Sequence, residues 1–151
     1  MSAAVAAAPA GRLDEPAAGR LLGAAREAMG RAYAPYSRFR VGAALLCDDG
    51  SVDGVVVEGC NVENASYPAC LCAERAAVGA AVVRGLTRFR AVAVATEADT
   101  PTPPCGMCRQ VLVEFAPALE VLSEGRAGRQ ARWTLDALLP APFVPDSMSR
   151  D

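Results

Sequence analysis

The sequence of 151 residues contains no histidine. That absence excludes Ser-His-Asp triads, histidine general bases and every metal site that needs an imidazole ligand. Lysine is absent as well, because all 15 cationic residues are arginine, and this excludes Schiff-base chemistry and the lysine of a P-loop. A bound metal would therefore have to use cysteine or carboxylate ligands.

The chain also lacks a basic stripe and a long apolar segment. The formal net charge is −2 and the arginines are scattered, so we expect no nucleic-acid polymer as a partner. The longest apolar run, residues 76–83, is far shorter than the ~18 residues of a membrane span. No positive charge precedes the apolar residues 2–10, which is unlike a secretory signal. We expect a cytoplasmic protein with reduced thiols and no membrane partner.

Composition predicts a single domain. Apolar residues make up 52% of the chain and charged residues 21%, and a chain of about 150 residues can bury a core without disulfide bonds. The alanine-rich start has no repeating face. We predict a flexible N-terminal tail over residues 1–12, one domain over 13–146 and a C-terminal tail over 147–151.

The hydrophobic pattern changes repeatedly between the helical and the strand period. Helices are predicted at 14 to about 33, 72–84 and 105–116, with a helical turn at 136–139. Strands are predicted at 41–47, 55–57, 91–95, 119–122 and 131–135, the first two joined as a hairpin by a long connection. Because crossover helices separate some of the strands, we predict an α/β fold, a three-layer α-β-α sandwich around a five-stranded mixed sheet.

Cysteine spacing is the strongest local signal. Cys105 and Cys108 form a C-x-x-C pair at a predicted helix start, which alone fits a zinc half-site, a redox pair or two ordinary cysteines. Cys72 opens the other crossover helix. Two helices on one face of a sheet can direct their N-termini at one point, where the helix dipoles stabilise thiolates. Three thiolates would leave one position of a zinc tetrahedron open, as in catalytic sites.

Two charged residues follow Cys72 in the same helical turn. The carboxylate of Glu74 can reach the open position without binding the metal, and it is a candidate proton shuttle because three thiolates weaken the effect of zinc on the pKa of water. The guanidinium of Arg75 can donate to thiolate sulfur and offset negative charge. A solvated helix residue is an equally simple interpretation of Arg75.

The motif C-A-E-R at 72–75, followed by P-C-G-M-C-R-Q at 104–110, resembles the zinc-dependent cytidine deaminase family in its small homotetrameric branch. The similarity leaves out only residues 1–15 and those after 145, and its further segments are 33–39, 41–44, 61–67, 111–115, 138–140 and 143. It implies one Zn²⁺ per chain bound by Cys72, Cys105 and Cys108. It also implies hydrolytic deamination of cytidine and 2′-deoxycytidine to the uridines with release of ammonia, for pyrimidine salvage. In this family Glu74 would shuttle protons between the zinc-bound hydroxide, ring N3 and the leaving amino group.

The resemblance extends to the substrate. Asn61 and Glu63 match residues that bind the ribose 3′-hydroxyl, Phe39 matches a ring packed on the pyrimidine, and the backbone of Ala73 would contact the base. A carboxylate and an amide opposite an aromatic wall suit a nucleoside. Without the zinc motif, the simpler interpretations are a turn residue for Asn61, a solvated charge for Glu63 and a core residue for Phe39.

Three further matches concern a neighbouring subunit. Ala65 and Tyr67 match positions that reach the sugar of the neighbour's substrate, and Phe143 matches a C-terminal aromatic that closes the neighbour's pocket. By this resemblance, the protein is expected to be a homotetramer with its active sites at subunit interfaces and a small nucleoside as substrate.

The remaining cysteines are predicted to be structural. Cys47 and Cys60 lie in predicted strands and are expected in the core. Cys70, two residues before a predicted ligand, is expected to be a small buried residue. Its alternative role is as a competitor for zinc or as a site of damaging oxidation.

Three other functions stay open at this stage. A blasticidin-type aminonucleoside deaminase shares the three-cysteine site, and the segment 61–67 favours the plain nucleoside enzyme over it. A non-catalytic zinc-binding domain would need a fourth ligand, for which Cys70 is the nearby candidate. Thiol redox catalysis at Cys105 and Cys108 would need no metal. Deaminases of deoxycytidylate and polynucleotides mostly use histidine at the position of Cys72.

Overall fold

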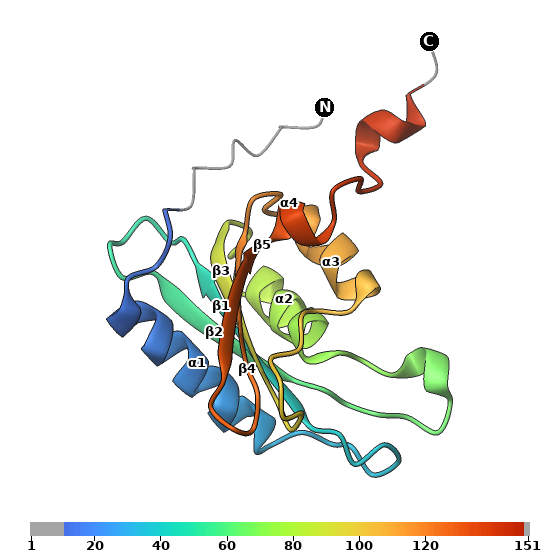
Figure 1. Ribbon diagram of the computed structural model, residues 1–151. Coiled ribbons are helices and arrows are strands. Elements are labelled where there is room, and N and C mark those ends of the chain that lie inside the picture. Colours follow the sequence, from blue (N-terminus) through green and yellow to red (C-terminus); the bar gives the residue numbers. More distant parts are fainter. Residues whose placement is uncertain (1–10, 150–151) are drawn as a thin grey trace.

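The computed structural model describes residues 11–149, which form three layers (Figure 1). The helices are α1 (Glu15–Met29), α2 (Ala73–Val83), α3 (Gly106–Val113) and α4 (Leu135–Leu138), with 3-10 turns η1 (Tyr67–Ala69) and η2 (Pro145–Met148). The strands are β1 (Val41–Cys47), β2 (Val55–Cys60), β3 (Phe89–Thr96), β4 (Glu120–Glu124) and β5 (Gln130–Thr134). Among these residues, none of the helices has the length and apolar character needed to cross a membrane.

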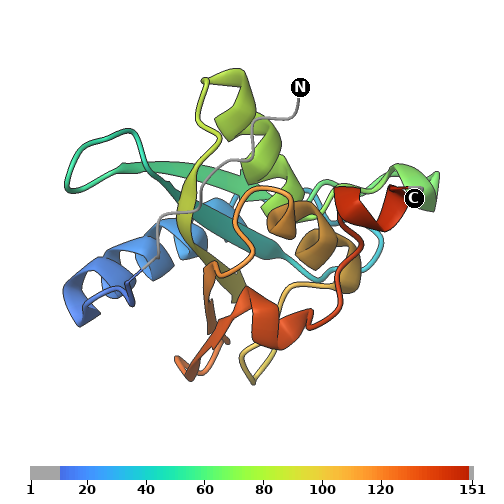
Figure 2. The same cartoon turned by 90° about the horizontal axis from the view of Figure 1, so that it is seen from above.

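The five strands form one mixed sheet in the order β2-β1-β3-β4-β5. Only β3 and β4 are parallel, and α3 is part of the crossover that joins them, whereas the other neighbours are antiparallel. Helix α1 covers one face, while α2, α3 and α4 cover the other (Figures 1 and 2). The predicted three-layer α-β-α sandwich with a five-stranded mixed sheet is confirmed.

Strand β1 separates two apolar cores because its side chains alternate between the faces. Ala43, Leu45 and Cys47 pack in the core under α2 and α3. Ala44 and Leu46 pack in the core under α1. All five are buried, as expected for a central strand covered on both faces.

Two glycines allow the helices to lie close to the sheet. A Cβ on Gly59 in β2 would lie 2.4 Å from both the carbonyl oxygen of Ala73 and the amide nitrogen of Ala77. A Cβ on Gly42 in β1 would lie 2.0 Å from the carbonyl oxygen of Ala25. Gly59 therefore fixes where the first turn of α2 sits, and with it the chain around Cys72.

The first helix is shorter than predicted. It ends at Met29 with Gly30 as its C-cap, whereas the sequence predicted an end near Tyr33. Tyr33 instead forms an isolated parallel bridge with Val62, its amide donating to the carbonyl of Asn61 at 3.0 Å. A contact with a segment remote in sequence thus outweighs the helical pattern.

Other boundaries move by a few residues. β2 continues to Cys60 and α3 ends at Val113, and Leu135 begins α4 rather than ending β5. Cys47 is buried as predicted, but the prediction for Cys60 is wrong, because this residue is half-buried on an edge strand with its thiol 3.6 Å from the carbonyl of Arg31. The predicted tails lie partly outside the described residues, at 1–10 and 150–151, and η2 crosses the predicted boundary at 146.

Candidate active site

Two helix N-termini meet at three cysteines. Cys72 is the N-cap of α2 and Cys105 is the N-cap of α3, both with extended backbone, and Cys108 lies in the first turn of α3. The Sγ atoms of Cys72 and Cys105 are 3.9 Å apart, and all three Sγ atoms lie within 4.8 Å of one another. Neither N-cap side chain caps its helix, so the positive ends of both dipoles face these sulfurs.

The three thiols fit a zinc ion. With Zn–S distances of about 2.3 Å and tetrahedral angles, sulfur atoms are separated by about 3.8 Å, close to the observed separation of Cys72 and Cys105. Among residues 11–149, the group of candidate ligands contains these three cysteines and does not include Cys70. The thiol of Cys70 instead accepts from the amide of Asn64 at 3.3 Å. The fourth ligand that a structural zinc site would need is not supplied by Cys70.

The charges in the cluster favour a thiolate at Cys72. The side-chain hydrogen bond between Cys72 and Cys108 contributes most to lowering the pKa of Cys72 to about 5, and Arg75 contributes in the same direction. That same bond to Cys72, together with burial, raises the pKa of Cys108. Arg75 Nη2 lies 3.7 Å from Cys72 Sγ and donates to the carbonyl of Cys70 at 2.9 Å. Arg75 is therefore turned toward the thiols and is not a solvated helix residue.

Glu74 is the buried carboxylate of the cluster. Only 5% of this residue is exposed, and burial raises its pKa above the ordinary value. Its Oε2 accepts from Cys108 Sγ at 3.5 Å. A carboxyl group that holds a proton more readily than usual, beside a cluster of thiols, is suited to proton transfer.

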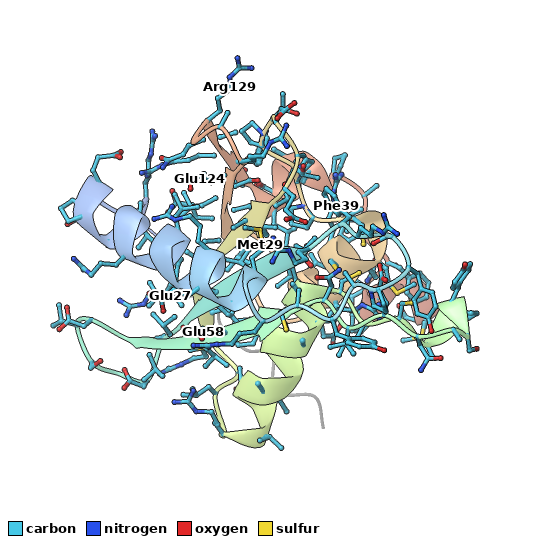
Figure 3. The ribbon with its side chains drawn as sticks, turned by 90° about the horizontal axis from the view of Figure 1, so that it is seen from below. Glu27, Met29, Phe39, Glu58, Glu124 and Arg129 are labelled. Atoms are coloured by element: carbon cyan, nitrogen blue, oxygen red, sulfur yellow. The ribbon has the colours of Figure 1, made fainter. Side chains whose placement is uncertain are left out.

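A cavity of about 320 Å³ opens beside the cluster, a size that suits a small ligand. The structure brings seven of the predicted site residues to its wall: Phe39, Asn61, Glu63, Cys72, Ala73, Glu74 and Cys105. Phe39 comes from the loop before β1, at the end of the sheet opposite the β1–β2 hairpin (Figure 3).

Asn61 and Glu63 already bond to the protein itself. Asn61 accepts from the amide of Val41 at 2.8 Å and donates to the carbonyl of Phe39 at 2.9 Å. Glu63 accepts from the amides of Tyr36 and Ser37 at 2.8 and 3.2 Å and from the Ser37 hydroxyl. These bonds lower the pKa of Glu63, that from the Ser37 hydroxyl most of all. Both residues therefore hold the loop that carries Phe39.

Three of the predicted substrate-binding residues lie outside this cavity. Ala65 is exposed, and Tyr67 is 72% exposed, with its ring edge-on to Tyr36 at 6.3 Å between centroids. Phe143 is 59% exposed, and its backbone is held on α3 by two hydrogen bonds to the Gln110 side chain. None of the three lines the cavity of its own chain.

Some lining residues were not identified from the sequence. Cys70 was predicted to be a buried structural residue, but it is half-buried and lines the cavity. The others are Ser37, Val41, Val62, Leu71, Val94, Thr96, Thr102 and Pro103. The Thr96 and Thr102 hydroxyls lie 3.3 Å apart. The end of a strand followed by a Thr/Pro loop was a signal that could have indicated the two threonines.

A three-thiol centre with a buried carboxylate, at helix N-termini of an α-β-α sandwich, defines a metal-dependent enzyme of α/β fold. Comparison of the sequence with known protein families identifies the family. Residues 17–123 match the model of the cytidine and deoxycytidylate deaminase zinc-binding region. The chain belongs to this family of zinc-dependent deaminases, which confirms the resemblance seen in its motifs.

The chain is also similar to individual proteins of this family over most of its length. A cytidine deaminase of Sporosarcina psychrophila is 40% identical over 131 residues, covering 86% of this chain and 93% of the relative. The crystal structure of cytidine deaminase from Burkholderia pseudomallei superposes with a TM-score of 0.77 at 46% identity, covering 83% of this chain and 98% of that one. The enzyme from Mycobacterium tuberculosis gives a TM-score of 0.71 at 43% identity, covering 83% and 96%.

Proposed function

We propose that this protein hydrolyses cytidine and 2′-deoxycytidine to uridine and 2′-deoxyuridine with release of ammonia. The observation that carries the proposal is the position of Glu74, a buried carboxylate 3.5 Å from Cys108 Sγ and in the wall of a nucleoside-sized cavity. The similarity to enzymes named cytidine deaminase supports the choice of substrate.

Cys72, Cys105 and Cys108 would hold one zinc ion per chain. When bound, zinc polarises water and makes it nucleophilic near neutral pH. Because the guanidinium of Arg75 already donates to Cys72, it would offset part of the negative charge of the three thiolates.

Glu74 would carry the protons of the reaction. Deamination forms a C4–O bond and breaks the C4–N bond, and protons must leave the attacking water and reach ring N3 and the departing amino group. Glu74 would take a proton from the water, return it at N3, and deliver the next one to the amino group as ammonia leaves. Its raised pKa fits a group that must hold and release protons within one cycle.

The rest of the cavity would orient the nucleoside. Phe39 would pack on the pyrimidine, and the backbone of Ala73 would contact the base. Asn61 and Glu63 would bind the ribose 3′-hydroxyl with the hydrogen-bonding capacity left by the loop, since an amide nitrogen has two protons and a carboxylate several lone pairs.

We also propose a homotetramer whose active sites lie at subunit interfaces. The high exposure of Tyr67 and Phe143 supports this, because large exposed aromatic side chains are candidates for burial against another subunit. A role in pyrimidine salvage and a cytoplasmic location, the latter consistent with cysteines that are free in the structure, complete the proposal.

The test combines zinc analysis with a cytidine assay. Purified protein should contain about one zinc per chain and should reduce the absorbance of cytidine and of 2′-deoxycytidine. Blasticidin S and deoxycytidylate, offered in parallel, should react far more slowly. Zinc-loaded protein that left both nucleosides unchanged while deaminating blasticidin S would contradict the proposal.

A further inference from the structure

An ion pair lies just beyond the paired ends of β1 and β3, at the rim of the cavity. Val41 and Thr96 are the last paired residues of β1 and β3 at this end, and both line the cavity. One step further, Glu97 accepts from the main-chain amide of Arg40 at 2.9 Å, and from its Nε and Nη2 at 3.0 and 2.6 Å. A carboxylate that binds both the amide and the guanidinium of one residue fixes its backbone as well as its side chain.

This pair flanks the segment that presents Phe39. The amide of Phe39 donates to Ser37 Oγ at 3.0 Å and its carbonyl accepts from Asn61 at 2.9 Å. Just before it, Arg38 has a φ of +59°, in the left-handed region that is unfavourable for a residue with a side chain. Such a conformation persists only where the surrounding contacts hold it.

The ring of Phe39 is not fixed by core packing, since the residue is 38% exposed. Its direction therefore depends on the backbone on either side, and Arg40 is the next residue. Neither Arg40 nor Glu97 lines the cavity itself. The pair can therefore affect a ligand in the cavity only through the residues next to it in the chain. Of these residues, Phe39 has the largest side chain.

We propose that Glu97 is a positioning residue that holds the Phe39 ring against the pyrimidine by fixing the backbone of Arg40. The inference rests on the proposed function, which assigns the base to Phe39. Because the pair lies at the surface, its direct effect on folding is small. Its loss would instead let the Phe39 segment relax away from the strained Arg38 conformation, which weakens substrate binding and leaves the proton transfer at Glu74 intact.

The chain supplies a matched control. Asp99 lies two residues after Glu97 in the sequence, and it accepts from Nε and Nη2 of Arg126 at 2.9 and 2.5 Å. The side chains of Arg126 and Asp99 are each 68% exposed, and neither residue lines the cavity. Asp99→Ala removes a neighbouring ion pair that makes no hydrogen bond to the segment of Phe39.

The experiment measures KM and kcat for cytidine with the zinc-loaded protein. Glu97→Ala should raise KM about tenfold with kcat nearly unchanged, as expected when an aromatic wall is displaced. Arg40→Ala keeps the amide bond to Glu97 and should raise KM only about threefold. Asp99→Ala should match the wild type. In a Phe39→Ala background, Glu97→Ala should have no further effect, since a residue that acts through Phe39 loses its influence with the ring.

The proposal would be overturned if Glu97→Ala raised KM by the same factor in the wild-type and the Phe39→Ala backgrounds. It would also be overturned if the Glu97→Ala protein lost zinc or melted well below the Asp99→Ala protein. Glu97→Gln keeps an acceptor for the amide of Arg40, so a partial recovery of KM supports the positioning role. Calorimetric binding of uridine follows the same variants without turnover. A wild type that binds uridine but leaves cytidine intact would reject the proposed function, while the Kd ratios would still decide the role of Glu97.

Discussion

The two ends of the cavity are built in different ways. At the sulfur end, Cys72 and Cys105 stand at the openings of α2 and α3, and packed helices on a sheet hold them. At the opposite end, Asn61 and Glu63 leave β2 in an irregular segment, and their side chains bond to the loop between Tyr36 and Val41. One end is fixed by secondary structure and the other by side-chain hydrogen bonds.

This difference separates two kinds of task. The sulfur end must place donor atoms within tenths of an ångström of one another, and rigid elements do that best. The loop end must share its hydrogen bonds between its own backbone and a ligand. Changes at the sulfur end should therefore act on zinc content and kcat, whereas changes at the loop end should act on KM.

Removing one thiol should have the largest effect. Cys105→Ala leaves two sulfur ligands and is expected to lose both the zinc and all measurable turnover. Metal analysis after dialysis and the cytidine assay measure this. Cys60→Ala, which removes a half-buried thiol outside the cluster, should keep both. Turnover by a metal-free Cys105→Ala protein would show that the sulfur end is not the reaction centre.

Removing the carboxylate alone should separate chemistry from metal binding. Glu74→Gln keeps the shape of the side chain and is expected to lower kcat by about 10²- to 10⁴-fold, the range for general acid–base catalysis. Its zinc content should stay at the wild-type level, because Glu74 is not among the three candidate ligands. If zinc is lost along with activity, Glu74 has a structural role at the metal. In that case metal binding and proton transfer at the sulfur end are not separate tasks.

The sulfur end was the part that the sequence could predict. Cys72, Glu74 and Arg75 lie within one helical turn, so their relative directions follow from helix geometry. The C-x-x-C pair is local in the same way. The meeting of the two helices followed from the crossover pattern, because helices on one face of a sheet have few arrangements.

The loop end could be predicted only by resemblance, and then incompletely. Residues Asn61 and Glu63 were identified, but nothing in the sequence indicated that they bond to the segment before β1. Ser37, which joins Glu63 to the amide of Phe39, was missed for the same reason. Such contacts depend on how segments more than 20 residues apart cross in space, and no local periodicity reports that.

The docking of α2 offers a smaller perturbation of the sulfur end. Gly59→Ala would place a Cβ 2.4 Å from the backbone of Ala73 and Ala77, so the first turn of α2 must shift. We expect a loss of about 1–3 kcal/mol in the free energy of unfolding, as for other overpacked sites, and weaker zinc retention against a chelator. Gly79→Ala on the same helix meets open space and should stabilise the protein by about 0.5–1 kcal/mol. Unchanged zinc retention in Gly59→Ala would mean that the thiols do not depend on how α2 sits.

The smallest effect is expected at Ser37, where the loop end meets Glu63. Ser37→Ala removes the bond that contributes most to lowering the pKa of Glu63 below its ordinary value of 4.5, and it should raise KM about two- to threefold without changing kcat. A carboxyl group whose pKa is lowered by folding stabilises the protein fully above 4.5, and this stabilisation is lost as the pH falls through the lower, folded value. Without Ser37, the folded pKa returns toward 4.5. The acid limb of the unfolding free energy should then become shallower, which urea titrations between pH 6 and 3 measure. An unaltered acid limb together with an unaltered KM would show that the Ser37 hydroxyl matters neither to Glu63 nor to the loop, and that the main-chain bonds to Glu63 and the bonds of Asn61 hold the loop without it.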